Sequence, residues 1–185
     1  MTTVFLSGSR KISRLSEEVR LRLDRMTDNH LKIVTGDANG ADKAMQGYLA
    51  EKRYPYVTIY FVGDAPRNNV GKWPTCNVIG DKKLSGRDFY AQKDNAMSKI
   101  ADYGLVLWDG KSSGSVQNMI WLLEAEKAVV VFVAPRRRFA TLRTQDEFVE
   151  LLSECDNEVL EDIGRKIALP ESLRRSDQTS LRFHS

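Results

Sequence analysis

The sequence predicts an α/β protein with a Rossmann-like, doubly wound parallel sheet of about five strands and extra C-terminal helices. Two observations lead to this fold class. Short apolar runs rich in Val, Ile and Phe alternate with longer segments of helical periodicity, and this alternation is typical of parallel sheets covered by helices. Most of the runs also end at a glycine, as buried strands do where the chain turns toward the next helix.

Five short runs have the composition of buried strands. In chain order they are Val4–Leu6, Ile33–Val34, Val57–Val62, Gly104–Trp108 and Ala128–Val133. The residues that close them are Gly8, Gly36, Gly63, Gly110 and Pro135. Glycine and proline interrupt regular structure, so they set the ends of the predicted strands.

Helices are predicted between the strands, because apolar residues recur there at helical spacing. Their stripes are Leu15, Val19, Leu23 and Met26; Ala44, Tyr48 and Leu49; Ala96, Ile100 and Ala101; and Met119, Ile120, Leu123 and Ala125. Two further helices are expected, one after Thr144 and one over Asn157–Ile167. We therefore expect a single domain over residues 1–169 and a polar, mobile tail over residues 170–185.

One connection is longer than the others. The 24 residues of Gly63–Gly86 follow the carboxyl end of the third predicted strand. Long loops in compact domains are commonly functional. We favour a lid or ligand-facing loop here, with a surface excursion over the sheet edge as the alternative.

Composition argues against several classes of function. Two cysteines and two histidines in 185 residues leave no basis for a zinc cluster or a Ser–His–Asp triad. No apolar run approaches the ~20 residues of a membrane span, so no membrane partner is expected. Cys76 and Cys155 share no redox or metal spacing, and the first residues lack the features of a secretory signal, so we expect a cytoplasmic protein.

The carboxyl ends of the predicted strands carry glycine, serine and charged residues. In open α/β sheets ligands bind beyond these ends. Glycine permits close backbone approach, the first N–H groups of the next helix face an anion, and Ser, Arg and Lys add donors and charge. The turns therefore predict a phosphate or ribose-phosphate site, although each turn alone would also serve as a plain helix cap. The predicted ligand-binding residues of these turns are Gly8, Ser9, Arg10, Gly36, Gly40, Asp42, Gly110, Lys111, Ser112, Ser113, Gly114 and Ser115.

Standard nucleotide-binding motifs do not match these turns. Leu105 stands where a Walker loop ending at Gly110-Lys111-Ser112 needs glycine, and neither Gly8 nor Gly36 begins a G-x-G-x-x-G. P-loop NTPases and ordinary dinucleotide-dependent dehydrogenases are therefore not expected.

Several motifs in order resemble those of the SLOG superfamily, which unites DprA-like DNA-binding proteins, LOG-type phosphoribohydrolases and YspA-like proteins. They are Gly8-Ser9-Arg10, Thr35-Gly36 with Gly40-Ala41-Asp42, Lys93 with Met97 and Ala101-Asp102, and Trp108-Asp109-Gly110-Lys111-Ser112-Ser113-Gly114-Ser115. The resemblance covers about residues 4–133 and looks closest to the YspA-like branch. It implies a Rossmann-like fold that binds a nucleotide or a nucleotide-derived ligand.

LOG-type members cleave the N-glycosidic bond of nucleoside 5′-monophosphates with an arginine and a glutamate. In this sequence Lys93 stands at the place of the arginine and Asn118 at the place of the glutamate. A neutral amide cannot act as a general base. If the chain hydrolyses its ligand, another carboxylate is needed, and we favour Asp109, with Asp94 as the alternative and Lys93 as the third catalytic candidate.

The segment after Gly86 is the other candidate for ligand contact. Helical spacing places Tyr90, Lys93 and Asp94 on one face, where a ring, an ammonium and a carboxylate could hold a base and its phosphate. Arg87, Asp88 and Asn118 complete the predicted binding set. A helix with only structural contacts is the alternative.

Three functions follow from these observations. The first is binding of a nucleotide or nucleoside-phosphate ligand, as a sensor or processing domain. The alternatives are a nucleoside 5′-monophosphate N-glycosidase and DprA-like binding of single-stranded DNA. Nucleic acid is the less favoured partner, because the 28 basic and 25 acidic side chains are mixed along the chain. No cofactor is required, Mg²⁺ would enter only with the ligand's phosphates, and the resemblance to LOG-type proteins implies a homodimer.

Overall fold

A seven-stranded sheet forms the centre of the molecule. The computed structural model describes residues 1–81 and 83–174. The strands are β1 (Thr3–Gly8), β2 (Lys32–Gly36), β3 (Val57–Phe61), β4 (Thr75–Asn77), β5 (Tyr103–Trp108), β6 (Ala128–Val133) and β7 (Arg138–Leu142). Their order across the sheet is β4-β3-β2-β1-β5-β6-β7, and only β7 runs antiparallel to its neighbour.

The predicted α/β fold class is confirmed, and each of the five predicted strands lies within the central part of the sheet. The two edge strands were not predicted. β4 has only three residues and lies inside the long Gly63–Gly86 connection, while β7 begins with Arg138 and lacks a continuous apolar run. Edge strands need less apolar sequence because one side has no strand neighbour, and charged residues there discourage aggregation.

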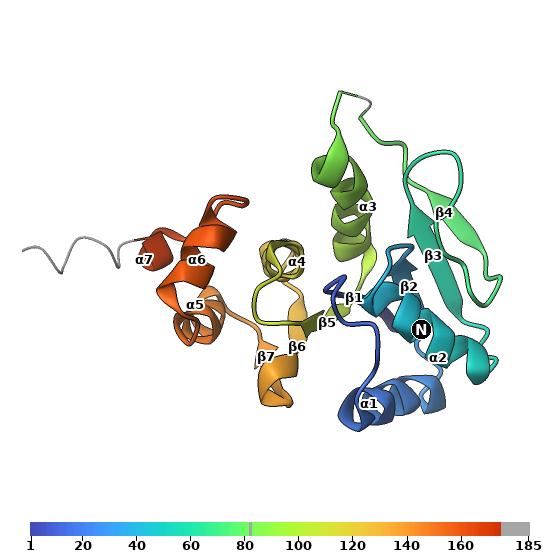
Figure 1. The fold of residues 1–185 in the computed structure, drawn as a ribbon. Coiled ribbons are helices and arrows are strands. Elements are labelled where there is room, and N and C mark those ends of the chain that lie inside the picture. The colour runs from blue at the N-terminus through green and yellow to red at the C-terminus, as the bar shows by residue number, and fades with distance from the viewer. Residues whose placement is uncertain (82, 175–185) are drawn as a thin grey trace, which may run out of the picture.

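Helices cover both faces of the sheet (Figure 1). Successive side chains of a strand point to opposite faces, so Val4 and Leu6 of β1 join one hydrophobic cluster and Phe5 joins the other. The first cluster packs against α1 (Glu17–Asp28) and α2 (Ala41–Glu51). The opposite face carries α3 (Gly86–Ile100), α4 (Ser113–Glu124), α5 (Gln145–Ser153), α6 (Asn157–Gly164) and α7 (Glu171–Arg174).

The C-terminal helices are part of this core. Ile163 of α6 is fully buried, and Leu173 of α7 is buried in the same cluster as Phe148 of α5. The tail predicted over residues 170–185 therefore starts with a short packed helix, and its residues 175–185 lie outside the described part of the chain.

The Gly63–Gly86 connection is anchored to the edge of the sheet. Its strand β4 pairs with β3. Trp73, next to β4, is 8% exposed, and its Nε1 donates a hydrogen bond to the Tyr54 carbonyl at 2.7 Å. The connection thus covers the sheet edge, which was the alternative expectation for this segment.

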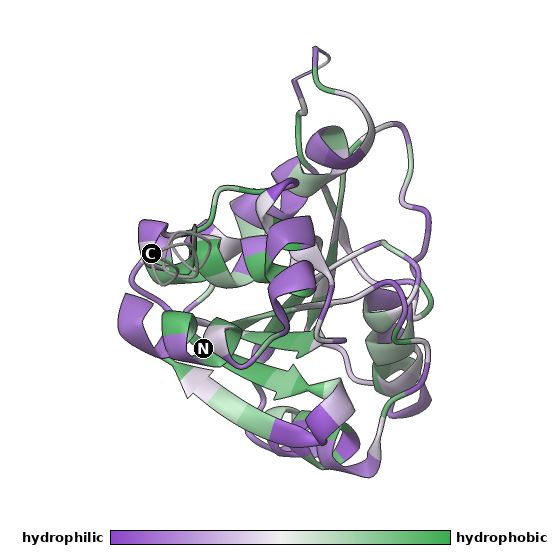
Figure 2. Cartoon of the chain, turned by 60° about the vertical axis from the view of Figure 1, so that its left-hand side comes forward, coloured by the Kyte–Doolittle hydropathy of each residue, from purple (hydrophilic) through white to green (hydrophobic). Residues whose placement is uncertain are grey.

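The hydropathy of the chain follows these layers. Hydrophobic residues gather in the central strands, and hydrophilic residues lie on outer helix faces and in the loops (Figure 2). Within the described residues, no helix has both the length and the apolar character needed to cross a membrane.

Candidate functional site

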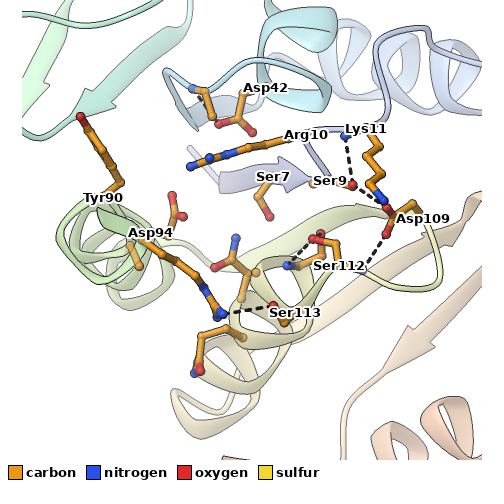
Figure 3. Close-up of a pocket in the computed structure, with 18 of the residues that line it drawn as sticks. Ser7, Ser9, Arg10, Lys11, Asp42, Tyr90, Asp94, Asp109, Ser112 and Ser113 are labelled. Carbon is orange, nitrogen blue, oxygen red and sulfur yellow. Dashed lines mark hydrogen bonds between the residues drawn. The ribbon is translucent and has the colours of Figure 1, made fainter. Parts of the chain in front are cut away.

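A cavity of about 430 Å³ opens at the carboxyl ends of β1 and β5. The strand order reverses between these two strands, because β2, β3 and β4 follow on one side of β1 and β6 and β7 on the far side of β5. Such a switch point is where open α/β sheets bind their ligands. Figure 3 shows the side chains that converge there.

Most of the predicted site residues line this cavity. They are Gly8, Ser9, Arg10, Asp42, Arg87, Tyr90, Lys93, Asp94, Asp109, Lys111, Ser112, Ser113, Gly114, Ser115 and Asn118. The structure does not place Gly36, Gly40, Asp88 or Gly110 among the lining residues. Gly40 caps α2 with a φ of +83°, and a Cβ there would lie 2.3 Å from the Arg10 carbonyl oxygen, so this glycine lets the two turns approach.

Asp109 ties the β1 and β5 turns together. Its Oδ2 accepts a hydrogen bond from Ser9 Oγ at 2.9 Å. Its Oδ1 accepts from the backbone N–H groups of Lys111 at 3.1 Å and Ser112 at 2.7 Å. The carboxylate predicted as the favoured catalyst therefore has three hydrogen-bond donors from the protein itself.

The N-terminus of α4 faces the cavity. Ser112 is the N-cap, and its Oγ accepts a hydrogen bond from the Ser115 N–H at 3.4 Å. The first N–H groups of a helix have no intrahelical partner and carry a partial positive charge. Beside them lies Ser7, which is 3% exposed and whose Oγ has no hydrogen-bond partner within the described residues. Unpaired donors thus gather on one wall.

Cations surround the same wall. Arg10, Lys11 and Lys111 line the cavity and have no acidic partner among the described residues. Arg87 reaches in from α3 and donates a hydrogen bond to Ser113 Oγ at 3.1 Å. The local field therefore favours an anion.

Below the opening lies a buried charged cluster. Lys93 is 2% exposed, and its Nζ lies 2.6 Å from Asp94 Oδ1. Burial disfavours the lysine's charge, but Asp94 and then Asp42 outweigh it and raise the pKa of Lys93. Burial raises the pKa of Asp42 to about 7, against the opposing charge of Lys93. A carboxyl group with this pKa can exchange a proton near neutral pH.

Arg67, which was not among the predicted site residues, lines the cavity from the long connection. Its backbone N–H and its guanidinium donate to the Asp37 carboxylate at 2.6–3.0 Å, and its Cζ lies 4.3 Å from the centre of the Tyr90 ring. Burial opposes the charge of Asp37, yet the Arg67 hydrogen bonds prevail and the pKa of Asp37 is lowered. The connection therefore also contributes a side chain to the cavity, while its role as a lid or ligand-facing loop stays a prediction.

Further lining residues were also missed as ligand contacts. They are Ser7, Lys11, Ala38, Ala91, Gln117, Trp121, Asp162 and Lys166. Ser113, Gln117 and Trp121 recur at four-residue spacing on one face of α4, which is a signal that the sequence does contain. Asp162 and Lys166 line the cavity because of how the chain after α5 packs against the sheet. No local sequence pattern predicts that packing.

Comparison with known proteins supports the fold. No protein-family model matches the sequence, and no curated protein matches it. Among solved structures, the chain is similar to DNA processing protein A (DprA) from Helicobacter pylori, a structure described for its single-stranded DNA binding mode, with a TM-score of 0.56 and 15% identity. The match covers 89% of this chain and 80% of that chain. It shows a shared fold with a DprA protein, while membership of the YspA-like branch stays a prediction.

Proposed function

We propose that the cavity binds a nucleotide or another nucleoside phosphate, with a phosphate group on the N-terminus of α4. The convergence of unpaired donors carries this proposal. The buried Ser7 Oγ has no partner within the described residues, and it lies beside the α4 N-terminus and the unpaired Arg10, Lys11 and Lys111. A buried hydroxyl without a partner costs free energy, and a phosphate oxygen would satisfy it.

The size of the cavity fits this class of ligand. About 430 Å³ lies within the range of roughly 300–1,000 Å³ that is typical of small-molecule sites. Tyr90, whose ring already stacks with Arg67, lines the cavity from α3 and supplies an aromatic surface for a base.

We favour binding over hydrolysis. Asp109 accepts three hydrogen bonds within the turns, and Asp94 pairs with Lys93, so both carboxylates named as catalysts have partners in the protein. Asn118, at the place of the family's glutamate, lines the cavity and cannot replace a carboxylate as a base.

A thermal-shift panel of nucleoside mono-, di- and triphosphates tests the proposal, followed by chromatography of each stabilising compound. A ligand at about 100 times its Kd adds about 2.7 kcal/mol to the free energy of unfolding. We expect a hit that is recovered intact. Release of free base and ribose 5-phosphate would instead establish the N-glycosidase, and a panel without any hit would refute the site.

The Ser7→Ala variant tests whether the ligand contacts the Ser7 hydroxyl. The variant loses an unsatisfied hydroxyl, so its stability without ligand should stay near that of the wild type. Its affinity for the ligand should fall by about 1.5–3 kcal/mol, the usual contribution of a hydrogen bond to a charged group. Ser98→Ala is the matched control, because Ser98 is equally buried but donates to the Asn95 carbonyl at 2.8 Å.

Single-stranded DNA is the second candidate, favoured by the structural likeness to DprA of Helicobacter pylori and by the cations around the cavity. Counterion release makes such binding fall steeply with salt, with a slope of about −0.7 per phosphate contact. Titration of a single-stranded oligonucleotide at several salt concentrations tests this. A mononucleotide that binds as tightly as the oligonucleotide at every salt concentration would exclude it.

A further inference from the structure

Trp121 differs from the other tryptophans of the chain. Trp73 and Trp108 are 8% and 1% exposed and belong to the hydrophobic clusters. Trp121 is only partly buried, belongs to neither cluster and lines the cavity. Within the described residues its indole has no hydrogen bond, ring contact or cation–π contact. A tryptophan at such a position leaves part of its ring open to the cavity, where a flat ligand group can stack on it.

The position of Trp121 extends the site along α4. Ser113, Gln117 and Trp121 follow one another at four-residue spacing on the face that lines the cavity. Eight residues at about 1.5 Å each place Trp121 about 12 Å farther along the helix than Ser113. Lys166, just after α6, lines the cavity as well, and its Nζ is paired there with the Asp162 carboxylate.

The cavity therefore has two aromatic side chains and one phosphate-binding wall. Tyr90 lines it from α3 and Trp121 from α4, while Arg87 and Ser113 meet at the start of α4. A mononucleotide with its phosphate on the α4 N-terminus and its base at Tyr90 leaves the indole without a contact. A second planar group would cover it.

We propose that Trp121 is a stacking platform for a second base, so that the ligand is a dinucleotide in which two bases are joined through phosphate. This inference rests on the proposed function of the cavity. Stacking of a base on an aromatic side chain changes affinity by roughly 5- to 150-fold. The platform gives the site a preference for two linked bases over one.

The test compares one base with two. The probes for the full-length protein are AMP, the phosphodiester-linked dinucleotide pApA and diadenosine diphosphate, with the same series in the other bases. In calorimetry, at least one dinucleotide should bind about 5-fold or more tightly than its mononucleotide. The two dinucleotides distinguish a phosphodiester from a pyrophosphate linkage. Tryptophan emission should change with the dinucleotide and much less with AMP.

Substitution then assigns the preference to the indole. In Trp121→Ala the Kd of the dinucleotide should rise to near that of the mononucleotide, while Trp121→Phe keeps most of the preference. Trp121→Leu retains apolar volume and should lose the preference even if the alanine variant is unstable. Tyr56→Ala is the control, since this aromatic residue is 44% exposed and lies at the opposite ends of the strands.

The outcomes separate this inference from the proposed function. If mononucleotides bind but no dinucleotide binds more tightly, or if Trp121→Leu weakens both probes equally, the stacking platform is refuted and the nucleotide site stands. If neither class of probe binds, both proposals fail.

Discussion

Asp42 is a carboxyl group that the fold keeps almost entirely out of water. Its pKa is raised from 3.8 to about 7, chiefly by burial. Because the folded pKa lies above the unfolded one, the folded state binds more protons between these values, and the free energy of unfolding falls as pH rises from about 4 to about 7. For the full pKa shift of Asp42, the free energy of unfolding falls by at most roughly 4 kcal/mol. The pKa of Asp37 is lowered from 3.8, so Asp37 changes the free energy of unfolding in the opposite direction. That change occurs below pH 3.8, outside this window.

Asp42→Asn should remove this slope. The variant should gain stability relative to the wild type as pH rises from 4.5 to 8, because the amide does not ionise. Urea unfolding at several pH values measures it, with Asp88→Asn on the exposed side of α3 as the control. Parallel stability curves for Asp42→Asn and the wild type would contradict the assignment.

Gly36 was predicted to contact the ligand, and the structure gives it a different role. A Cβ there would lie 2.5 Å from Asp42 Oδ2 and 2.6 Å from Lys93 Nζ. Gly36→Ala should therefore push the buried charges apart and cost about 1–3 kcal/mol, as overpacking does. Gly47→Ala is the matched control. It lies inside α2, where an added Cβ would have no described atom within 4 Å apart from its chain neighbours and its own helix backbone, so alanine there should stabilise the protein by up to ~1 kcal/mol. Equal effects of the two variants in denaturant unfolding would show that Gly36 is not needed for space.

At the scale of the element, the α4 N-terminus combines a structural and a binding role, and two substitutions at Ser112 separate them. Ser112→Ala removes the N-cap and should cost about 1 kcal/mol of stability as well as ligand affinity. Ser112→Asp keeps a good cap and should keep the stability. Its carboxylate, however, occupies the anion position, so ligand-induced stabilisation should disappear. Thermal unfolding of both variants with and without ligand distinguishes the two roles. If Ser112→Asp still binds the ligand, the phosphate does not bind at the α4 N-terminus.

Elements with strong local signals were predictable, and elements that depend on tertiary contact were not. The runs that became β1, β5 and β6 are apolar throughout, so their burial on both faces was readable. β4 and β7 lack such runs and exist because a neighbouring strand offers hydrogen bonds. Within the site, the glycine and serine turns were predictable from their composition. The position of Arg67 was not predictable, because no local pattern in a long polar loop indicates which carboxylate an arginine will pair with.

At the scale of the whole molecule, the C-terminal helices and the cavity belong to one packed unit. Ile163, Ile167, Leu169 and Leu173 share a hydrophobic cluster with Val131 and Val133 of β6 and with Met119 of α4. α6 also contributes Asp162 to the cavity, and Lys166 follows just after the helix. We therefore expect residues 1–174 to unfold in a single cooperative transition, with calorimetric and van't Hoff enthalpies that agree.

Ile163→Ala tests this coupling, since Ile163 is fully buried next to Asp162, whereas Ile100→Ala changes a side chain that is 50% exposed. Removing the buried atoms should cost about 2–5 kcal/mol and shift the whole transition, and the exposed control should change stability by less than about 0.5 kcal/mol. Because the cavity wall at Lys166 depends on the same packing, the buried variant should also bind the dinucleotide probe more weakly. A second, separate transition in Ile163→Ala, with ligand binding unchanged, would show instead that the C-terminal helices fold apart from the sheet and do not form the site.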